Sequence, residues 1–219
     1  GQIGAALLHR LVHEGWRVHA VSRQARDPSA GVQWLQGDLA QPPQLPAAVD
    51  VVFSCGPLDA FSQWYAHAVL QCARVIVFSS TSVMVKQDSQ DPFERDLAAR
   101  LALRERQVLE RAARQKTMVT ILRPTLVWGA GWDRSLSRIA SLAHRYGLFV
   151  LPRSAIGGRH PVHVDDLADA AMAVIHCPAS AGQAYALAGG EVLTYEQMVR
   201  RVLAALPCSP RLWLLPEGV

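Results

Sequence analysis

The chain has 219 residues, of which half are hydrophobic and 18% are charged, a balance typical of a globular protein with one sizeable core. No apolar run reaches the roughly 18 residues of a membrane span, and no signal segment opens the chain, so we expect a cytoplasmic protein. The net charge of +4 comes almost entirely from dispersed arginines, which argues against a nucleic-acid surface. The four scattered cysteines lack C-x-x-C spacing and are expected to be free thiols.

Apolar segments of strand length alternate with helical patterns through the first 128 residues. Strands buried on both faces form continuous apolar runs, as in parallel sheets covered by helices. Strand–helix alternation therefore predicts a doubly wound α/β sheet. The predicted strands are 18–21, 51–54, 75–78 and 118–122, and the predicted helices are 3–13, 60–72 and 93–114.

After Trp128 glycine and proline become denser, which indicates a second, smaller lobe. Thr194 and Gln197 have the spacing of a capping box, and Asp165 or Asp166 is expected to cap an earlier helix. The predicted elements are helices 135–146, 165–175 and 194–205 and a strand at 184–187. We assign 1–128 and 165–182 to a dinucleotide-binding domain, and 129–164 and 183–219 to a substrate-binding lobe.

The chain opens with two glycines, Gly1 and Gly4, separated by Gln2 and Ile3, and continues directly into a helix. Glycines at such a turn let the backbone approach a pyrophosphate, and the helix N-terminus offers free N–H groups. The alternative is a simple loop at the start of a helix.

The next predicted strand ends in Ser22 and Arg23, with Arg26 close by. Folds that prefer NAD usually have a carboxylate here, which holds the ribose 2′-hydroxyl. An arginine suits a 2′-phosphate, so we predict NADP as the cofactor, with NAD as the alternative. The competing interpretation of Arg23 is a solvated surface arginine.

In these features and in four further motifs the chain resembles the extended short-chain dehydrogenase/reductase family, the NAD(P)-dependent epimerase/dehydratase group. The motifs are Gly37-Asp38-Leu39, the Ser/Thr-rich segment 78–83, the R-P-x-x-V-W-G segment 123–129 and the V-H-V-D-D segment 162–166. The resemblance implies a Rossmann-type sheet whose first strand lies upstream of Gly1. It implies cofactor contacts from Gly1, Gln2, Ile3, Gly4, Ser22, Arg23, Asp38, Leu39, Cys55, Gly56, Pro57, Ser79, Ser80, Arg123, Pro124 and Thr125.

The resemblance places the family's active-site Ser/Thr at Thr81, but the family's Tyr-x-x-x-Lys pair is absent from this sequence. Alignment of the long helix puts Ala102 at the tyrosine position and Arg106 at the lysine position. Arginine can bind a ribose, but its pKa is too high for ordinary proton transfer. Lys86, five residues after Thr81, is a candidate general acid, and a solvated loop lysine is the alternative. The predicted catalytic residues are Thr81, Lys86 and Arg106.

Two functions from different classes remain open. One is an NAD(P)-dependent oxidoreductase or epimerase acting on a carbonyl, alcohol or nucleotide-sugar substrate. The other is a non-catalytic NADP-binding sensor or scaffold that has lost the proton-relay tyrosine. The long helix from Phe93 is a candidate homodimer surface. We expect no metal site, since His160, His163 and the neighbouring aspartates match no common metal-binding spacing.

Overall fold

The computed structural model describes residues 1–133 and 135–216. The chain forms two compact units. The first contains Gly1, Ile3–Pro124 and Asp165–Leu187, and the second contains Gln2, Thr125–Val164 and Ala188–Val219. The predicted division differs at two strands: 126–128, expected in the dinucleotide-binding domain, belongs to the second unit, and 184–187, expected in the lobe, pairs with the sheet of the first unit.

The strands of the first unit are parallel and form two sheets. β1 (Val18–Ser22) pairs with β2 (Val32–Gln36), and a four-stranded sheet has the order β10-β5-β4-β3. Within residues 1–133 and 135–216, no strand joins β1 to β3. The larger sheet comprises β3 (Ala48–Ser54), β4 (Gln71–Phe78), β5 (Met118–Pro124) and β10 (Ala184–Leu187). The predicted parallel α/β architecture is therefore confirmed.

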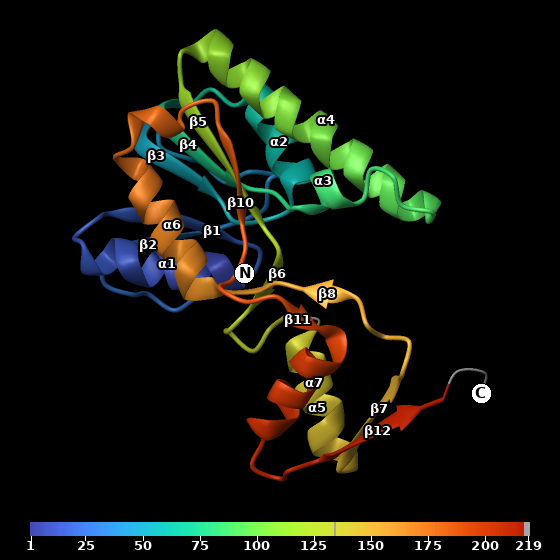
Figure 1. The fold of residues 1–219 in the computed structure, drawn as a ribbon. Coiled ribbons are helices and arrows are strands. Elements are labelled where there is room, and N and C mark those ends of the chain that lie inside the picture. Colours follow the sequence, from blue (N-terminus) through green and yellow to red (C-terminus); the bar gives the residue numbers. More distant parts are fainter. Residues whose placement is uncertain (134, 217–219) are drawn as a thin grey trace. The chain divides into compact units, whose positions relative to one another are not determined.

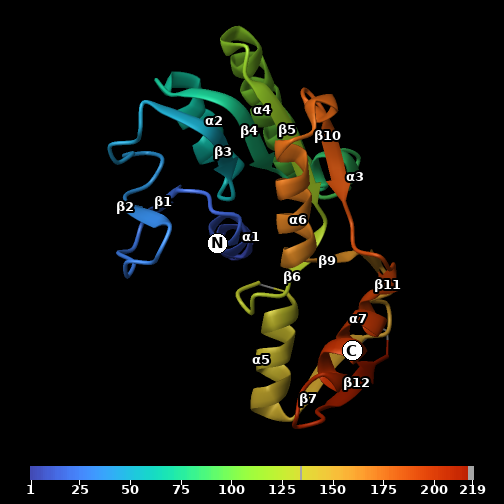
Figure 2. The ribbon, with the colours of Figure 1, turned by 90° about the vertical axis from the view of Figure 1, so that its left-hand side faces the viewer.

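Helices cover both faces of the larger sheet. Figures 1 and 2 show α2 and α4 side by side on one face, with α1 and α6 on the other side. Arg10 of α1 ties these last two helices together through ion pairs to Asp165 and Asp169 of α6 at 3.0 and 2.5 Å. The helices of this unit are α1 (Gln2–His13), α2 (Leu58–His67), the short α3 (Ser82–Val85), α4 (Pro92–Gln115) and α6 (Val164–Ile175), with a 3₁₀ turn at Pro178–Ser180.

The core of this unit lies where the middle strands meet α2 and α4. Val75 and Val77 of β4 pack against Phe61 and Tyr65 of α2 in one buried cluster. Ile76, between the two valines, points to the opposite face because side chains alternate along a strand, and it is also fully buried. Burial on both faces explains why β4 is a continuous apolar run rather than an alternating one.

Two helix boundaries follow from local backbone chemistry. The helix predicted at 60–72 ends at His67, because Ala68 is extended with φ −60° and ψ 130°, and Cys72 already belongs to β4. The Asp91 carboxylate caps α4 by accepting a 2.9 Å hydrogen bond from the Phe93 N–H, and Pro92 occupies the first helical position.

A buried arginine fastens the amino-terminal end of the sheet to the 3₁₀ turn. The Arg74 guanidinium, in a residue that is 3% exposed, donates to the Ser180 hydroxyl, to the Cys177 carbonyl at 2.8 Å and to the Thr120 hydroxyl at 3.2 Å. Each of these acceptors is neutral. The charge is therefore held by hydrogen bonds rather than by a carboxylate, which ties residues 177–180 to β4 and β5.

The second unit is built around two helices and a small parallel sheet. α5 (Leu136–Tyr146) and α7 (Tyr195–Ala204) share a buried cluster with β7 (Leu148–Pro152) and β12 (Arg211–Leu215). The predicted capping box at Thr194 and Gln197 is confirmed. Two shorter ladders complete this unit: β6 (Leu126–Trp128) with β9 (Pro161–His163), and β8 (Gly158–Arg159) with β11 (Leu193–Thr194). None of the described helices is long and apolar enough to cross a bilayer.

Candidate functional site

The glycine turn lies against the carboxyl end of β3. A Cβ atom added to Gly4 would lie 3.4 Å from the Cys55 Cβ, and one added to Gly1 would lie 3.5 Å from the Cys55 carbonyl oxygen. The first backbone hydrogen bond of α1 runs from Ala5 to the Gly1 carbonyl, and no side chain caps the helix. The N–H groups of Gln2, Ile3 and Gly4 are therefore available to an anionic group at the positive end of the helix.

Two buried hydroxyls at the carboxyl ends of neighbouring strands lack a hydrogen-bond partner among the described residues. They are the Oγ atoms of Ser54, the last residue of β3, and Ser79, directly after β4. The Oε1 atom of Gln2 is also buried and unpartnered within the same described residues. Buried polar groups are nearly always hydrogen-bonded, so these atoms fit a bound polar ligand that supplies the missing partners.

Cys55, Gly56 and Pro57 connect β3 to α2. Burial raises the pKa of the Cys55 thiol to about 12, so the side chain is a neutral wall next to the glycine turn and not a nucleophile. A Cβ on Gly56 would meet nothing within 4 Å, which leaves the backbone there open. Pro57 precedes α2, and its carbonyl accepts the first hydrogen bond of that helix, from the Phe61 N–H at 3.1 Å.

The end of β1 carries the residues predicted to select the cofactor. Ser22 Oγ accepts from the Gln24 N–H at 3.3 Å, and the Ser22 carbonyl accepts from the Gly37 N–H at 2.9 Å. Arg23 is exposed, and no ion pair to it is formed by the residues that the structure describes. The Arg26 guanidinium lies 5.9 Å from the centre of the Trp34 ring of β2, the strand that pairs with β1.

Asp38 and Leu39 are occupied within their own loop. Asp38 Oδ1 accepts from the N–H groups of Ala40 and Gln41, both at 2.9 Å, and forms an Asx turn. Leu39 packs against the core cluster under α2 and α4. The structure thus gives both residues a role in shaping the loop, and their predicted contact with an adenine ring stays a prediction.

Thr81 lies in the turn between β4 and α3. Its N–H and its hydroxyl both donate to the Pro124 carbonyl, at 3.1 and 3.3 Å, while the Ser79 N–H donates to the Leu122 carbonyl at 2.8 Å. Ser80 Oγ lies 3.1 Å from Ser82 Oγ and accepts from the Ser82 N–H at 3.2 Å. The end of β5 therefore holds the Thr81 hydroxyl with its lone pairs free to accept a hydrogen bond.

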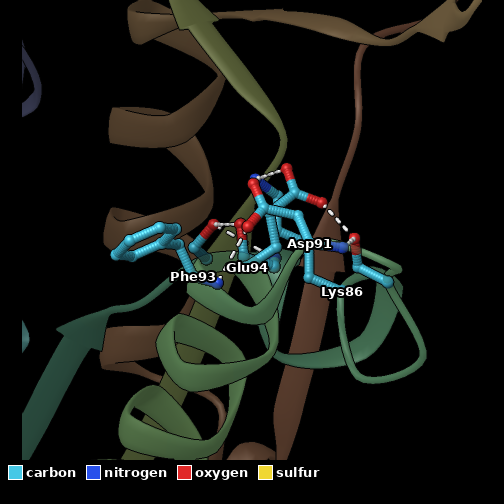
Figure 3. A network of polar contacts seen from close by, with 7 residues as sticks. Lys86, Asp91, Phe93 and Glu94 are labelled. Atoms are coloured by element: carbon cyan, nitrogen blue, oxygen red, sulfur yellow. Dashed lines mark hydrogen bonds and ion pairs between the residues drawn. The ribbon is translucent and has the colours of Figure 1, made fainter.

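Lys86, the candidate general acid, forms an ion pair. Its Nζ lies 2.7 Å from Glu94 Oε1, and the Ser89 hydroxyl donates to Glu94 Oε2 at 2.7 Å (Figure 3). The hydrogen bond from Lys86, then that from Ser89, lowers the pKa of Glu94 below its usual value. The pair links the end of α3 to the first turn of α4, so the Lys86 ammonium group is held by Glu94, and its predicted role as a general acid stays a prediction.

Arg123, predicted to contact the cofactor, and Arg106, predicted to be catalytic, have different surroundings. Arg123 forms a bidentate ion pair with Glu105 of α4, with N–O distances of 3.0 and 2.5 Å. The Arg106 side chain is 67% exposed, and its ion-pair partner is Glu110 at 3.8 Å. The inward-facing residue at this level of α4 is therefore Glu105, which the sequence analysis missed. Helical spacing was a usable signal, since Ala98, Glu105, Val108 and Ala112 recur on one buried side.

In the second unit, residues 125–129, which follow β5, contact residues 160–163, which precede α6. The Thr125 hydroxyl donates to the His160 carbonyl. The His163 ring meets the Trp128 ring edge-on, with 4.7 Å between centres. A Cβ on Gly129 would lie 2.2 Å from His163 Nε2, so only glycine fits there. Trp132 is 64% exposed. Residues 1–133 and 135–216 contain no cluster of three or more potential metal ligands.

Comparison with known proteins agrees with this arrangement. A 2-alkyl-3-oxoalkanoate reductase from Stenotrophomonas maltophilia is 28% identical, over 94% of this chain and 73% of the relative. Among solved structures, MoeE5 in complex with UDP-glucose and NAD has a TM-score of 0.75 at 20% identity, covering 99% of this chain and 82% of that one.

A UDP-glucose 4-epimerase from Thermotoga maritima, solved with UDP-glucose, has a TM-score of 0.72 at 12% identity, covering 99% of this chain and 84% of that chain. At these identities the solved structures support the fold alone. The model of the NAD dependent epimerase/dehydratase family matches residues 1–188, and the chain belongs to that family.

Proposed function

We propose that the chain is an NADP-dependent oxidoreductase that reduces a carbonyl compound or oxidises the corresponding alcohol. One observation carries the proposal: the uncapped start of α1 and the unpartnered Ser54 and Ser79 hydroxyls lie at the carboxyl ends of the parallel strands. Ligands of open α/β sheets bind at that edge, and a dinucleotide supplies both a pyrophosphate and ribose hydroxyls. NAD is the alternative cofactor.

Several residues of the chain fit the cofactor. The N–H groups of Gln2, Ile3 and Gly4 would bind the pyrophosphate. Arg23, with Arg26 nearby, would bind a 2′-phosphate through charge-assisted hydrogen bonds. Cys55, Gly56, Ser79, Ser80 and Pro124 border the same edge of the sheet. The bound cofactor would supply the hydride chemistry, and the protein orients the reactants.

Thr81 is the residue we propose to contact the reacting oxygen. Its hydroxyl already donates to the Pro124 carbonyl at 3.3 Å, a long contact that can be exchanged for one to a substrate oxygen. Arg106, exposed and paired with Glu110, is not arranged to donate a proton. We therefore propose that Thr81 orients the substrate and that the proton reaches the product oxygen from water or from Lys86 once its pair with Glu94 opens.

The relatives favour a carbonyl compound over a nucleotide sugar. The Stenotrophomonas maltophilia relative, by its name, reduces a 3-oxoalkanoate, and its similarity extends along 94% of this chain. The nucleotide-sugar proteins resemble the chain in fold at 20% identity or below. A 3-oxo acid is thus the first substrate class to test, with nucleotide sugars as the second.

The decisive experiment measures NADPH oxidation against a panel of 3-oxo acids, other ketones and UDP-sugars, on the full-length protein. We expect turnover that Thr81→Ala lowers by about 100-fold, the effect of losing one positioned hydrogen bond in a transition state. Thr117→Ala serves as the control, since the Thr117 hydroxyl donates to the Cys72 carbonyl at 3.2 Å, near the amino-terminal ends of β4 and β5. Equal turnover by the Thr81→Ala variant would contradict the assignment of Thr81.

A non-catalytic NADP sensor is the second candidate, favoured by Ala102 and the exposed Arg106 where the family has its proton-relay pair. A sensor binds NADPH tightly, turns over no member of the panel, and changes its protease sensitivity when the dinucleotide binds. Turnover of any panel compound that Thr81→Ala abolishes would exclude this alternative.

A further inference from the structure

The α2–α4 groove is a hollow of about 370 Å³ on the outer side of the first unit. Its polar lining is defined by Gln63 and His67 of α2 and by Arg104, Gln107, Arg111 and Arg114 of α4, with Glu110 as its single acidic residue. The two helices lie side by side along this groove (Figure 1). The groove belongs to neither the glycine turn nor the Thr81 site.

The charges around the groove do not balance. Arg104 is neutralised by Asp59, with 2.9 Å between Nε and Oδ1, but Asp59 does not line the hollow. Glu110 lies 4.0 Å from Arg114 and 3.8 Å from Arg106, so both of its ion pairs are at the limit of contact. Arg111 and Arg114 thus face the hollow with one carboxylate, Glu110, which is also shared with Arg106.

Arg111 is the residue that most clearly lacks a counter-charge. Its Nη2 donates to the carbonyl of Ala68, at the end of α2, at 3.2 Å. Its Nε is buried and makes no hydrogen bond to any described residue, and those residues form no ion pair with it. A partly buried guanidinium group without a counter-charge is unfavourable, and an anion in the groove that Arg111 lines would supply that charge.

The other side chains are arranged to assist. Arg104 donates from Nη1 to Gln107 Oε1 at 3.0 Å, which fixes both side chains along the wall of the hollow. Gln63, Gln107 and His67 add further donors, and guanidinium groups bind phosphate and carboxylate oxygens in bidentate fashion. We infer that the α2–α4 groove binds a small, multiply charged anion with phosphate or carboxylate groups, with Arg111 as its central contact.

A second copy of this chain is the competing occupant, since α4 was a candidate dimer surface. A two-fold pairing through the groove would bring the uncompensated arginines of both copies together, and like charges across an interface are unfavourable. A bound anion would neutralise the positive charge of the groove arginines, whereas a second copy of the chain would increase it.

The test is calorimetric titration of the full-length protein with inorganic pyrophosphate and, separately, with citrate at low ionic strength. We expect saturable binding of one or both that Arg111→Gln weakens at least tenfold. Arg114→Gln, which changes a 74% exposed side chain, should weaken it as well and provides a second variant if Arg111→Gln fails to fold. Stronger pyrophosphate binding would identify a phosphate ligand, and stronger citrate binding a carboxylate ligand.

The matched control is Arg95→Gln, which removes the same charge from the same helix about 24 Å away along its axis. It should leave the affinity within twofold of the unmodified protein, as should Arg23→Ala at the proposed cofactor site. Two results would overturn the inference. One is the absence of saturable binding to either anion, and the other is equal binding by Arg111→Gln. If neither anion binds and the sedimentation mass falls from dimer to monomer in Arg111→Gln, the groove is instead an interface between two copies of the chain.

Discussion

Glu105 of α4 and Arg123 of β5 form a buried, bidentate ion pair, in which the Glu105 side chain is 5% exposed and the Arg123 side chain 19% exposed. Arg123 directly precedes Pro124, whose carbonyl accepts two hydrogen bonds from Thr81. The ion pair therefore connects the long helix to the strand end that holds the candidate active-site threonine.

Replacement of Glu105 by glutamine leaves the Arg123 cation largely buried without a counter-charge. Removing one partner of a buried ion pair costs about 3–5 kcal/mol. We therefore expect Glu105→Gln to lower the free energy of unfolding by an amount near the lower end of that range. Urea unfolding followed by circular dichroism measures it. Glu110→Gln, on the exposed side of the same helix, should change the free energy of unfolding by less than about 0.5 kcal/mol. If Glu105→Gln and Glu110→Gln lower the free energy of unfolding by similar amounts, the Glu105–Arg123 ion pair does not stabilise the fold more than an exposed one.

Gly129 is required by the position of the His163 ring. A Cβ at Gly129 would lie 2.2 Å from His163 Nε2, and the backbone there has φ +120°. We expect Gly129→Ala to destabilise the second unit by at least about 2 kcal/mol, through overpacking and backbone strain together. Gly131 also has positive φ, at +73°, but a Cβ there meets nothing within 4 Å. Gly131→Ala should therefore cost only about 1 kcal/mol, and thermal unfolding of the two variants compares them directly.

Asp133 makes the stability of the second unit dependent on pH. Burial alone would raise the pKa of Asp133, but hydrogen bonds from Ser137 and Ser135 outweigh it and lower the pKa below 3.8. The folded state thus favours the carboxylate form of Asp133. Its contribution to the free energy of unfolding is complete above the pKa of Asp133 in the unfolded chain. That contribution is lost as the pH falls through the lower pKa of the folded state. Asp133→Asn should lower the free energy of unfolding at pH 6 and have a smaller effect at pH 3. An equal effect at both pH values would contradict the ionised hydrogen-bonded state.

The thiols should differ widely in reactivity. Burial raises the pKa of Cys55 to about 12, so this thiol stays protonated at pH 8, whereas Cys208 is exposed. Because the thiolate is the nucleophile, iodoacetamide should modify Cys208 first and Cys55 last in the native protein. Peptide mass spectrometry over a time course gives both rates. Labelling of Cys55 within tenfold of the Cys208 rate would contradict a buried, neutral thiol beside the glycine turn.

Much of the first unit was predictable, because its signals are local. Residues 75–78 are all apolar, and a strand with apolar side chains on both faces is stable only where both faces are covered. This pattern alone predicts a central parallel strand. In the second unit, the Thr194–Gln197 spacing likewise predicted a helix start through capping hydrogen bonds that involve only neighbouring residues. The strand predicted at 75–78 ends at Phe78 in the structure, and Thr81 follows in the turn before α3.

The partners of the charged side chains could not be predicted, because each pair joins residues far apart in the sequence. The position of Lys86 after Thr81 predicts a general acid, but nothing local predicts its ion pair with Glu94 and the Ser89 hydrogen bond beside it. The motif around Arg123 predicts a cofactor contact, but only the packing of α4 against β5 shows its ion pair with Glu105. Sequence by itself determined the strand–helix alternation and the glycine turn. Only the tertiary structure decided which charges are neutralised and which remain available, since electrostatic energy depends on distances that folding alone sets.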